Sequence, residues 1–287
     1  MIQTFVMHIK PYFIVALAGA LLVGCLDDTN TVTKSGDKPI IEAYLAPGHP
    51  VSMFVYTEIS YENAADSTSM PINGLQIQIS GNNGQSFKLT NVGEGIYKSS
   101  SDQVIGPAGT AYEMNFSYNG RTISASTTIP PKPVGFTINE TEIYRTQRNL
   151  SGGLGSGAFP GGNNDDNTAV EATWTNPNQE YFFLSVQNIE SSPEQITILP
   201  NGNTLPVRGF TNEPVNSTVA NISPQSLSYF GRYDVILYRV GADYAALYKS
   251  AGTTTQNLST PPSSISNGLG IFTGINADTL LLSVLKK

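Results

Sequence analysis

The chain of 287 residues is poor in the side chains that most often act as nucleophiles, bases and metal ligands. It has one cysteine, Cys25, and two histidines, His8 and His49. An internal disulfide is excluded, and so are sites that need several cysteine or histidine side chains. Stability must therefore come from the burial of apolar side chains. Charged residues make up only 13% of the chain and form no cluster of lysine or arginine. Because nucleic-acid backbones are bound by concentrated positive charge, we expect no nucleic-acid partner.

The longest apolar stretch, residues 12–23, is also too short for a membrane-spanning helix, which takes about 20 residues. A basic residue, Lys10, precedes it, which is typical of a secretion signal. The stretch ends in Leu22-Val23-Gly24-Cys25, which resembles the lipobox of bacterial lipoproteins. The resemblance implies that residues 1–24 are a signal peptide and that lipidation of Cys25 attaches the chain to a membrane. An ordinary secretory peptide that happens to contain a cysteine is the alternative.

The remaining chain is acidic and suits a folded, exported protein. Without residues 1–24, which contain one charged residue, it has 14 basic and 22 acidic residues, a balance of −8. Residues 25–38 are polar and non-periodic, which predicts a flexible tether. Val, Ile, Leu, Tyr and Phe recur along the rest, so it has the composition of one large or two ordinary domains.

Residues 39–131 alternate apolar and polar side chains with period two, as half-buried strands do. The clearest unit is a hairpin over residues 112–129 whose turn is Asn119-Gly120. This pair favours a type I′ turn, because both central residues need positive φ. Several short strands separated by turn signals predict an N-terminal β-sandwich.

The prolines of residues 130–133 mark a boundary, because they cannot donate hydrogen bonds to a sheet. Residues 134–287 predict a second β domain with strands at 134–144, 170–177, 181–186, 233–240 and 279–285, a long Gly/Asn-rich loop at 145–168, and a short helix at 242–250. Leu227 precedes Tyr233 by six residues, which is similar to the tyrosine corner of fibronectin type III domains. The expected fold is all-β, with two immunoglobulin/fibronectin-like β-sandwich domains in series and one short helix.

Few residues are candidates for binding. Tyr229, Phe230 and Tyr244 could form an exposed contact surface, although packing in the core is the alternative. Trp174 could be a sugar platform or, as in many sandwiches, a core residue. We expect no metal site, with one alternative: Asp165 and Asp166 lie in an oxygen-rich stretch that would suit Ca²⁺.

No pattern favours catalysis, so we expect a non-enzymatic protein without a cofactor. His49 lies between prolines in a turn, and no nucleophile and acid accompany it in the sequence. A hydrolase built on two carboxylates is the remaining enzymatic alternative. Ser67 and Thr279 each follow an aspartate, which resembles the acceptor motif of Bacteroidota O-glycosylation.

Segments throughout the chain behind Cys25 together resemble the Bacteroidota lipoprotein family catalogued as domain of unknown function 4249. The segments are residues 38–48, 51–55, 129–130, 174–177, 231–235, 244 and 265–272, and the most specific is Asn267-Gly-Leu-Gly-Ile-Phe272. The Gly/Asn-rich loop at 151–167 departs from the family pattern.

The resemblance implies an outer-membrane lipoprotein, often encoded beside a TonB-dependent receptor, and no known chemistry. Together with the lipobox and the lack of catalytic patterns, it leads us to expect a protein on the cell-surface or periplasmic face that binds a ligand for, or assists, such a receptor. The alternative function is a structural or adhesive surface protein that uses tandem β-sandwiches as contact modules.

Overall fold

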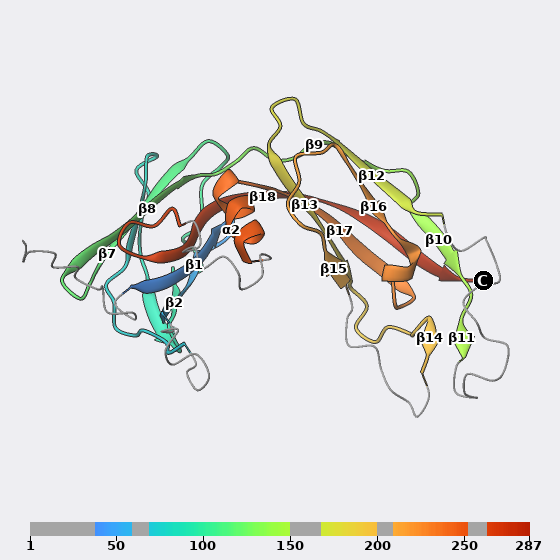
Figure 1. The fold of residues 1–287 in the computed structure, drawn as a ribbon, viewed down its shortest axis with the longest axis horizontal. Helices are drawn as coiled ribbons and strands as arrows, with labels where there is room; N and C mark the ends of the chain where they lie inside the picture. The colour runs from blue at the N-terminus through green and yellow to red at the C-terminus, as the bar shows by residue number, and fades with distance from the viewer. Residues whose placement is uncertain (1–37, 59–68, 150–167, 200–208, 252–262) are drawn as a thin grey trace, which may run out of the picture. The chain divides into compact units, whose positions relative to one another are not determined.

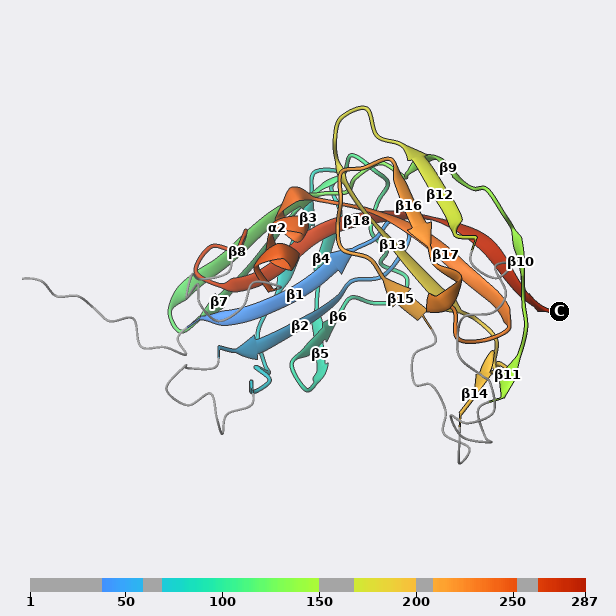
Figure 2. The same ribbon diagram turned by 45° about the vertical axis from the view of Figure 1, so that its right-hand side comes forward.

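The computed structural model describes residues 38–58, 69–149, 168–199, 209–251 and 263–287. The predicted signal peptide, most of the tether, Ser67 and most of the 145–168 loop, including Asp165 and Asp166, lie outside these ranges. The described residues all belong to one compact unit. Its described part is mostly β-structure arranged in several sheets, with one α-helix (Figures 1 and 2).

The first hydrophobic core takes side chains from two sheets. The first sheet is part of a nine-stranded sheet and has the strand order β18-β1-β2-β6-β5. The second is a four-stranded sheet with the order β4-β3-β7-β8. The bounds are β1 (Pro39–Leu45), β2 (Ser52–Thr57), β3 (Gln78–Gly81), β4 (Ser86–Lys88), β5 (Thr90–Gly93), β6 (Ile96–Lys98), β7 (Ala111–Tyr118), β8 (Arg121–Thr128) and β18 (Leu269–Lys286).

Alternating burial confirms the period-two pattern of this half. In β7, Tyr112, Met114 and Phe116 are buried while the residues between them are not. The predicted hairpin is also confirmed, because β7 pairs with β8 up to Tyr118↔Arg121. Both turn residues have positive φ, +50° at Asn119 and +73° at Gly120, as a type I′ turn requires.

The second core takes side chains from the order β15-β13-β17-β18 of the nine-stranded sheet and from the three-stranded sheet β16-β12-β9. Strand β10 also pairs with β18, and β11 pairs with β14. The bounds are β9 (Val134–Ile138), β10 (Glu142–Arg145), β11 (Arg148–Asn149), β12 (Val170–Thr175), β13 (Tyr181–Asn188), β14 (Thr197–Ile198), β15 (Gly209–Thr211), β16 (Val219–Ile222) and β17 (Gly231–Val240), followed by the helix α2 (Ala242–Ala251).

Two local signals of this half are confirmed. The hydroxyl of Tyr233 donates to the carbonyl of Tyr229 at 2.8 Å and accepts from its amide at 3.0 Å, which is the bond that a tyrosine corner makes. The helix predicted at 242–250 is α2, with Asp243 in its first turn and Lys249 in its last. Both charges complement the helix dipole.

The last strand is the main departure from expectation, because β18 begins at Leu269 rather than near Thr279 and contributes to both cores. Over Leu269–Gly274 it pairs in parallel with β1, and over Ile275–Val284 it pairs antiparallel with β17. Phe272 is buried in the first core and Leu282 in the second. The blue strand β1 lies beside the red strand β18 in Figure 1.

Two glycines explain why the sequence pattern does not predict a strand in the first part of β18. Gly270 has φ +95°, and a Cβ placed there would lie 2.1 Å from the carbonyl oxygen of Ile41. A Cβ at Gly274 would lie 2.6 Å from the carbonyl oxygen of Thr128. Glycine is a poor strand former, yet close backbone contact permits nothing larger at these two positions.

The proline-rich linker is attached to β18 through side chains. The Asn276 side chain donates to the carbonyl of Pro130 at 2.9 Å, and Lys132 forms a 2.8 Å ion pair with Asp278. Side-chain oxygens of Asn276 and Asp278 also accept the amides of the residues that follow them. Two edge amides of β18, those of Ala277 and Thr279, are thus bonded beside a segment whose prolines cannot pair with the strand.

We predict that Phe272→Ala destabilises the protein by about 3–5 kcal/mol, as expected for a fully buried phenylalanine. Although Phe272 is near the C-terminus, the main loss of protection should appear in β2, β7 and β8 by peptide-resolved hydrogen exchange. Leu184→Ala is the matched control, and its loss should fall on the second core. If Phe272→Ala increased exchange only in the second core, as Leu184→Ala should, Phe272 would not stabilise the first core and β18 would not be shared between the two cores.

We also predict that Gly270→Ala lowers the urea midpoint clearly more than Gly109→Ala. Both glycines have positive φ, which costs a larger residue about 1–3 kcal/mol. A Cβ at Gly109 meets nothing within 4 Å, whereas one at Gly270 meets the β1 backbone. Equal midpoints would show that close pairing of β1 and β18 does not need this glycine.

Candidate binding site

Tyr229 and Phe230, two of the three residues predicted for an exposed contact surface, lie in the interior. Their exposed fractions are 5% and 7%. The backbone of Tyr229 is bonded to the Tyr233 hydroxyl, and the amide of Phe230 donates to the carbonyl of Glu194. These bonds draw the segment before β17 into the core, so the core alternative describes both residues.

The other described candidates have simple positions. Trp174 is 5% exposed and packs against Phe182, with ring centroids 5.8 Å apart, so it is a core residue. His49 is exposed in the turn between β1 and β2, and Thr279 is exposed on β18. The lipobox Leu22, Val23, Gly24 and Cys25, together with Asp165, Asp166 and Ser67, lies outside the described residues.

Tyr244 belongs to a cluster of aromatic rings that ties α2 to the nine-stranded sheet. Its ring stacks on Phe183 of β13 at 5.4 Å and meets Tyr44 of β1 edge-on at 6.0 Å. Phe183 also stacks on Tyr238 of β17 at 4.7 Å. We call Tyr44, Phe183, Tyr238 and Tyr244 the aromatic cluster. It connects a strand of the first core with two strands of the second.

The cluster is partly open to solvent. Tyr44 is 38% exposed, and Tyr248, one turn beyond Tyr244 on α2, is 42% exposed. Burial raises the pKa of the Tyr44 hydroxyl, and the neighbouring Glu42 carboxylate raises that pKa further by disfavouring the phenolate and accepting its hydrogen bond. Burial likewise raises the pKa of Tyr238 and Tyr244. The hydroxyls therefore stay protonated; that of Tyr44 donates to Glu42, whereas the raised pKa values of Tyr238 and Tyr244 come from burial, with nearby charge added at Tyr244, rather than from a hydrogen bond.

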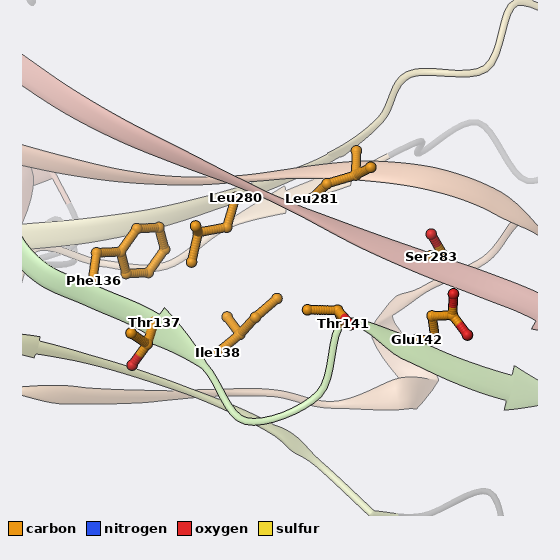
Figure 3. Close-up of a pocket in the computed structure, with 8 residues that line it drawn as sticks. All are labelled: Phe136, Thr137, Ile138, Thr141, Glu142, Leu280, Leu281 and Ser283. Atoms are coloured by element: carbon orange, nitrogen blue, oxygen red, sulfur yellow. The ribbon is translucent and has the colours of Figure 1, made fainter.

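A cleft of about 540 Å³ opens where the chain passes from one sheet to another (Figure 3). Strand β9 pairs with β12, whereas β10 pairs with β18. Because the chain changes partner between them, it leaves a gap beside β18. Phe136, Ile138 and Leu280 project into this gap and form an apolar floor.

The rim of the cleft is polar on one side. Glu142 and Ser283 are register partners in β10 and β18, so their side chains share a face of the sheet. Leu281 lies on that face too, and its side chain is 46% exposed. A second cavity of about 280 Å³, which shares Glu142 with the first, includes the buried Arg145 and Lys287 in its lining.

A third cavity, of about 410 Å³, lies beside the start of α2. Arg239 and Glu180 form an ion pair in its wall, and Asp243 accepts a hydrogen bond from Thr273 at 3.3 Å. Because these charged side chains already pair with one another or with Thr273, they are less available to bind a ligand than the polar groups of the first cleft.

Two general features complete the description. Across the described ranges, no group of three or more His, Cys, Asp or Glu side chains could hold a metal ion. None of the helices that the structure describes is both long and apolar enough to cross a membrane.

The described chain is thus a mostly β protein with two cores joined by one strand. A family model matches residues 28–280, and the chain belongs to that family, described as domain of unknown function (DUF4249). The match confirms this part of the resemblance read from the sequence. No curated protein matches the chain.

Three solved structures that match the chain are distant, each at 10% identity. They are the apo structure of Bacteroides uniformis β-glucuronidase 3 (72% of this chain, TM-score 0.23), the Yersinia pseudotuberculosis adhesin InvE (86%, 0.21) and the titin fragment A168169 (86%, 0.19). This chain spans 24% of the glucuronidase, 58% of the adhesin and 98% of the titin fragment. Scores this low support no argument about fold or function.

Sequence reasoning missed most of the residues that shape these surfaces. Tyr44, Phe183 and Tyr238 lie on three strands far apart in the sequence, and only the pairing of those strands brings their rings together. Glu142 and Ser283 are likewise joined only by the parallel pairing of β10 and β18. In the sequence, Glu142 is one glutamate inside the strand expected at 134–144, and nothing local distinguishes it from the other glutamates.

We predict that Tyr244→Leu destabilises the protein by about 1–3 kcal/mol in urea unfolding, because it removes two ring contacts worth about 0.5–1.5 kcal/mol each. Tyr248→Leu is the matched control on the same helix. Being 42% exposed, Tyr248 should change stability by no more than about 0.5 kcal/mol. Equal losses in the two variants would mean that the aromatic cluster does not hold α2.

Proposed function

We propose that this protein is a non-enzymatic outer-membrane lipoprotein, anchored through Cys25, that binds a ligand for, or assists, a TonB-dependent receptor. The Leu22-Val23-Gly24-Cys25 sequence carries the proposal, since it resembles a lipobox directly ahead of the family region at residues 28–280. A lipid on Cys25 would hold the folded unit at a membrane surface.

The structure offers two surfaces that suit such a role. The partly exposed aromatic cluster provides tyrosine surface, and tyrosine is enriched in protein interfaces. The cleft between β9, β10 and β18 provides a concave apolar site with a polar rim, as small-molecule sites do. The first surface suits a protein partner and the second suits a ligand.

We further propose that each core is a β-sandwich and that the second is fibronectin-like. The inward residues of two sheets fill each core, and Tyr233 makes a tyrosine-corner bond. The passage of the chain from β9 in one sheet to β10 in the other fits an edge strand that switches sheets.

We predict that the native protein, extracted in mild detergent from its own cells, co-purifies with a β-barrel receptor. Cys25→Ser provides the control for anchoring, because it removes the thiol that would be lipidated, and it should move the protein from the membrane fraction to the soluble fraction. Mass spectrometry of the purified complex identifies the partner. A chain that stays membrane-bound without Cys25, or that purifies without any β-barrel protein, would refute the proposal.

A structural or adhesive surface protein is the second candidate. The observation that favours it is β18, which runs unbroken through strand pairs of both cores and would resist their separation under load. Genes for adhesins or pili beside this gene, and binding of the purified protein to cells or matrix, would favour this function over receptor assistance.

A further inference from the structure

The cleft beside β18 combines an apolar floor with a single charge. Phe136, Ile138 and Leu280 form the floor, while the rim carries hydroxyl groups and one carboxylate. Among the described residues that line it, Glu142 alone is charged.

The backbone adds hydrogen-bond acceptors to the same rim. The amide of Ser283 donates to the carbonyl of Thr141 at 2.8 Å, so the backbone groups of odd-numbered residues in this part of β18 face β10. The carbonyl groups of Thr279 and Leu281, and the amide of Leu281, therefore face the cleft edge. In the described chain, residues 275–282 pair with a strand on the β17 edge only. On this edge, the amide of Thr279 donates a hydrogen bond to the side chain of Asp278.

We propose that this cleft binds a small molecule with a compact apolar body and a protonated amine. The apolar body would lie against Phe136, Ile138 and Leu280, and Leu281 would cover part of it. The ammonium group would pair with Glu142 and donate to the Ser283 hydroxyl and the edge carbonyls. An ammonium has three donors and no acceptor, which matches the Glu142 carboxylate, the edge carbonyls and a hydroxyl that can accept.

An extended peptide strand is a poorer occupant of the same place. Side chains of Asn276 and Asp278 already occupy the amides of the residues that follow them, and β10 takes the edge from Ser283 onward. The free edge between these points is too short for a ladder of several bonds. Charge complementarity with Glu142 therefore identifies the ligand better than strand pairing does.

This inference deepens the ligand-binding role proposed above and rests on it. The test uses the purified full-length chain in detergent and three matched probes: 2-phenylethylammonium, 3-phenylpropan-1-ol and 3-phenylpropanoate. Titration followed by amide NMR shifts measures each affinity and locates the site. We expect shifts centred on residues 136–142 and 279–283, with the ammonium bound about threefold to tenfold more tightly than the carboxylate, as for a partly exposed ion pair.

The variants separate charge from apolar contact. Glu142→Gln, at an exposed position, should remove the preference for the ammonium, and Glu113→Gln, an exposed glutamate on β7, should leave it intact. Leu281→Gln should weaken all three probes alike. Equal binding of ammonium and carboxylate by the native chain, a preference that survives Glu142→Gln, or shifts centred elsewhere would each overturn the inference. Co-purification with a receptor does not depend on these outcomes, so the two proposals can fail separately.

Discussion

The parallel pairing of β1 with the first part of β18 is the constraint on which the rest of the structure depends. It brings the last described segment of the chain against the first, because Ile40 pairs with Leu269 and Leu45 with Gly274. The same strand then pairs with β17 and closes the second core. Neither core is therefore complete without β18, and the close approach at Gly270 leaves no room for a side chain. One strand thus contributes pairing and buried side chains to both cores.

The candidate sites follow from this arrangement. With β18 committed to β1 at one end and β10 at the other, its middle has a strand on one edge only, and the proline-rich linker runs beside the other edge. The cleft lies where this edge meets the passage from β9 to β10. The aromatic cluster lies where α2 spans strands of both cores, so its rings serve packing first and can serve contact where they remain exposed.

Local features were the part of the fold that the sequence predicted well. Asn119-Gly120 predicted a type I′ hairpin because few other pairs accept two positive φ angles. The helix at 242–250 and the Leu227–Tyr233 spacing were correct for similar short-range reasons. The expected strand at 134–144 is split into β9 and β10, which join different sheets. Of the three residues predicted for a contact surface, Tyr244 is half-buried in the aromatic cluster, while Tyr229 and Phe230 are buried.

The sequence by itself determined the family, the mostly β character, the local turns and the scarcity of thiol and imidazole groups. These depend on residue types and on neighbours a few positions apart, which a sequence displays directly. Only the tertiary structure decided that β18 serves both cores, that Glu142 meets Ser283, and that Tyr44 meets Tyr244. Such pairings depend on strand register across more than a hundred residues. Register is set by the burial of whole faces and by backbone contact, and no local pattern encodes either.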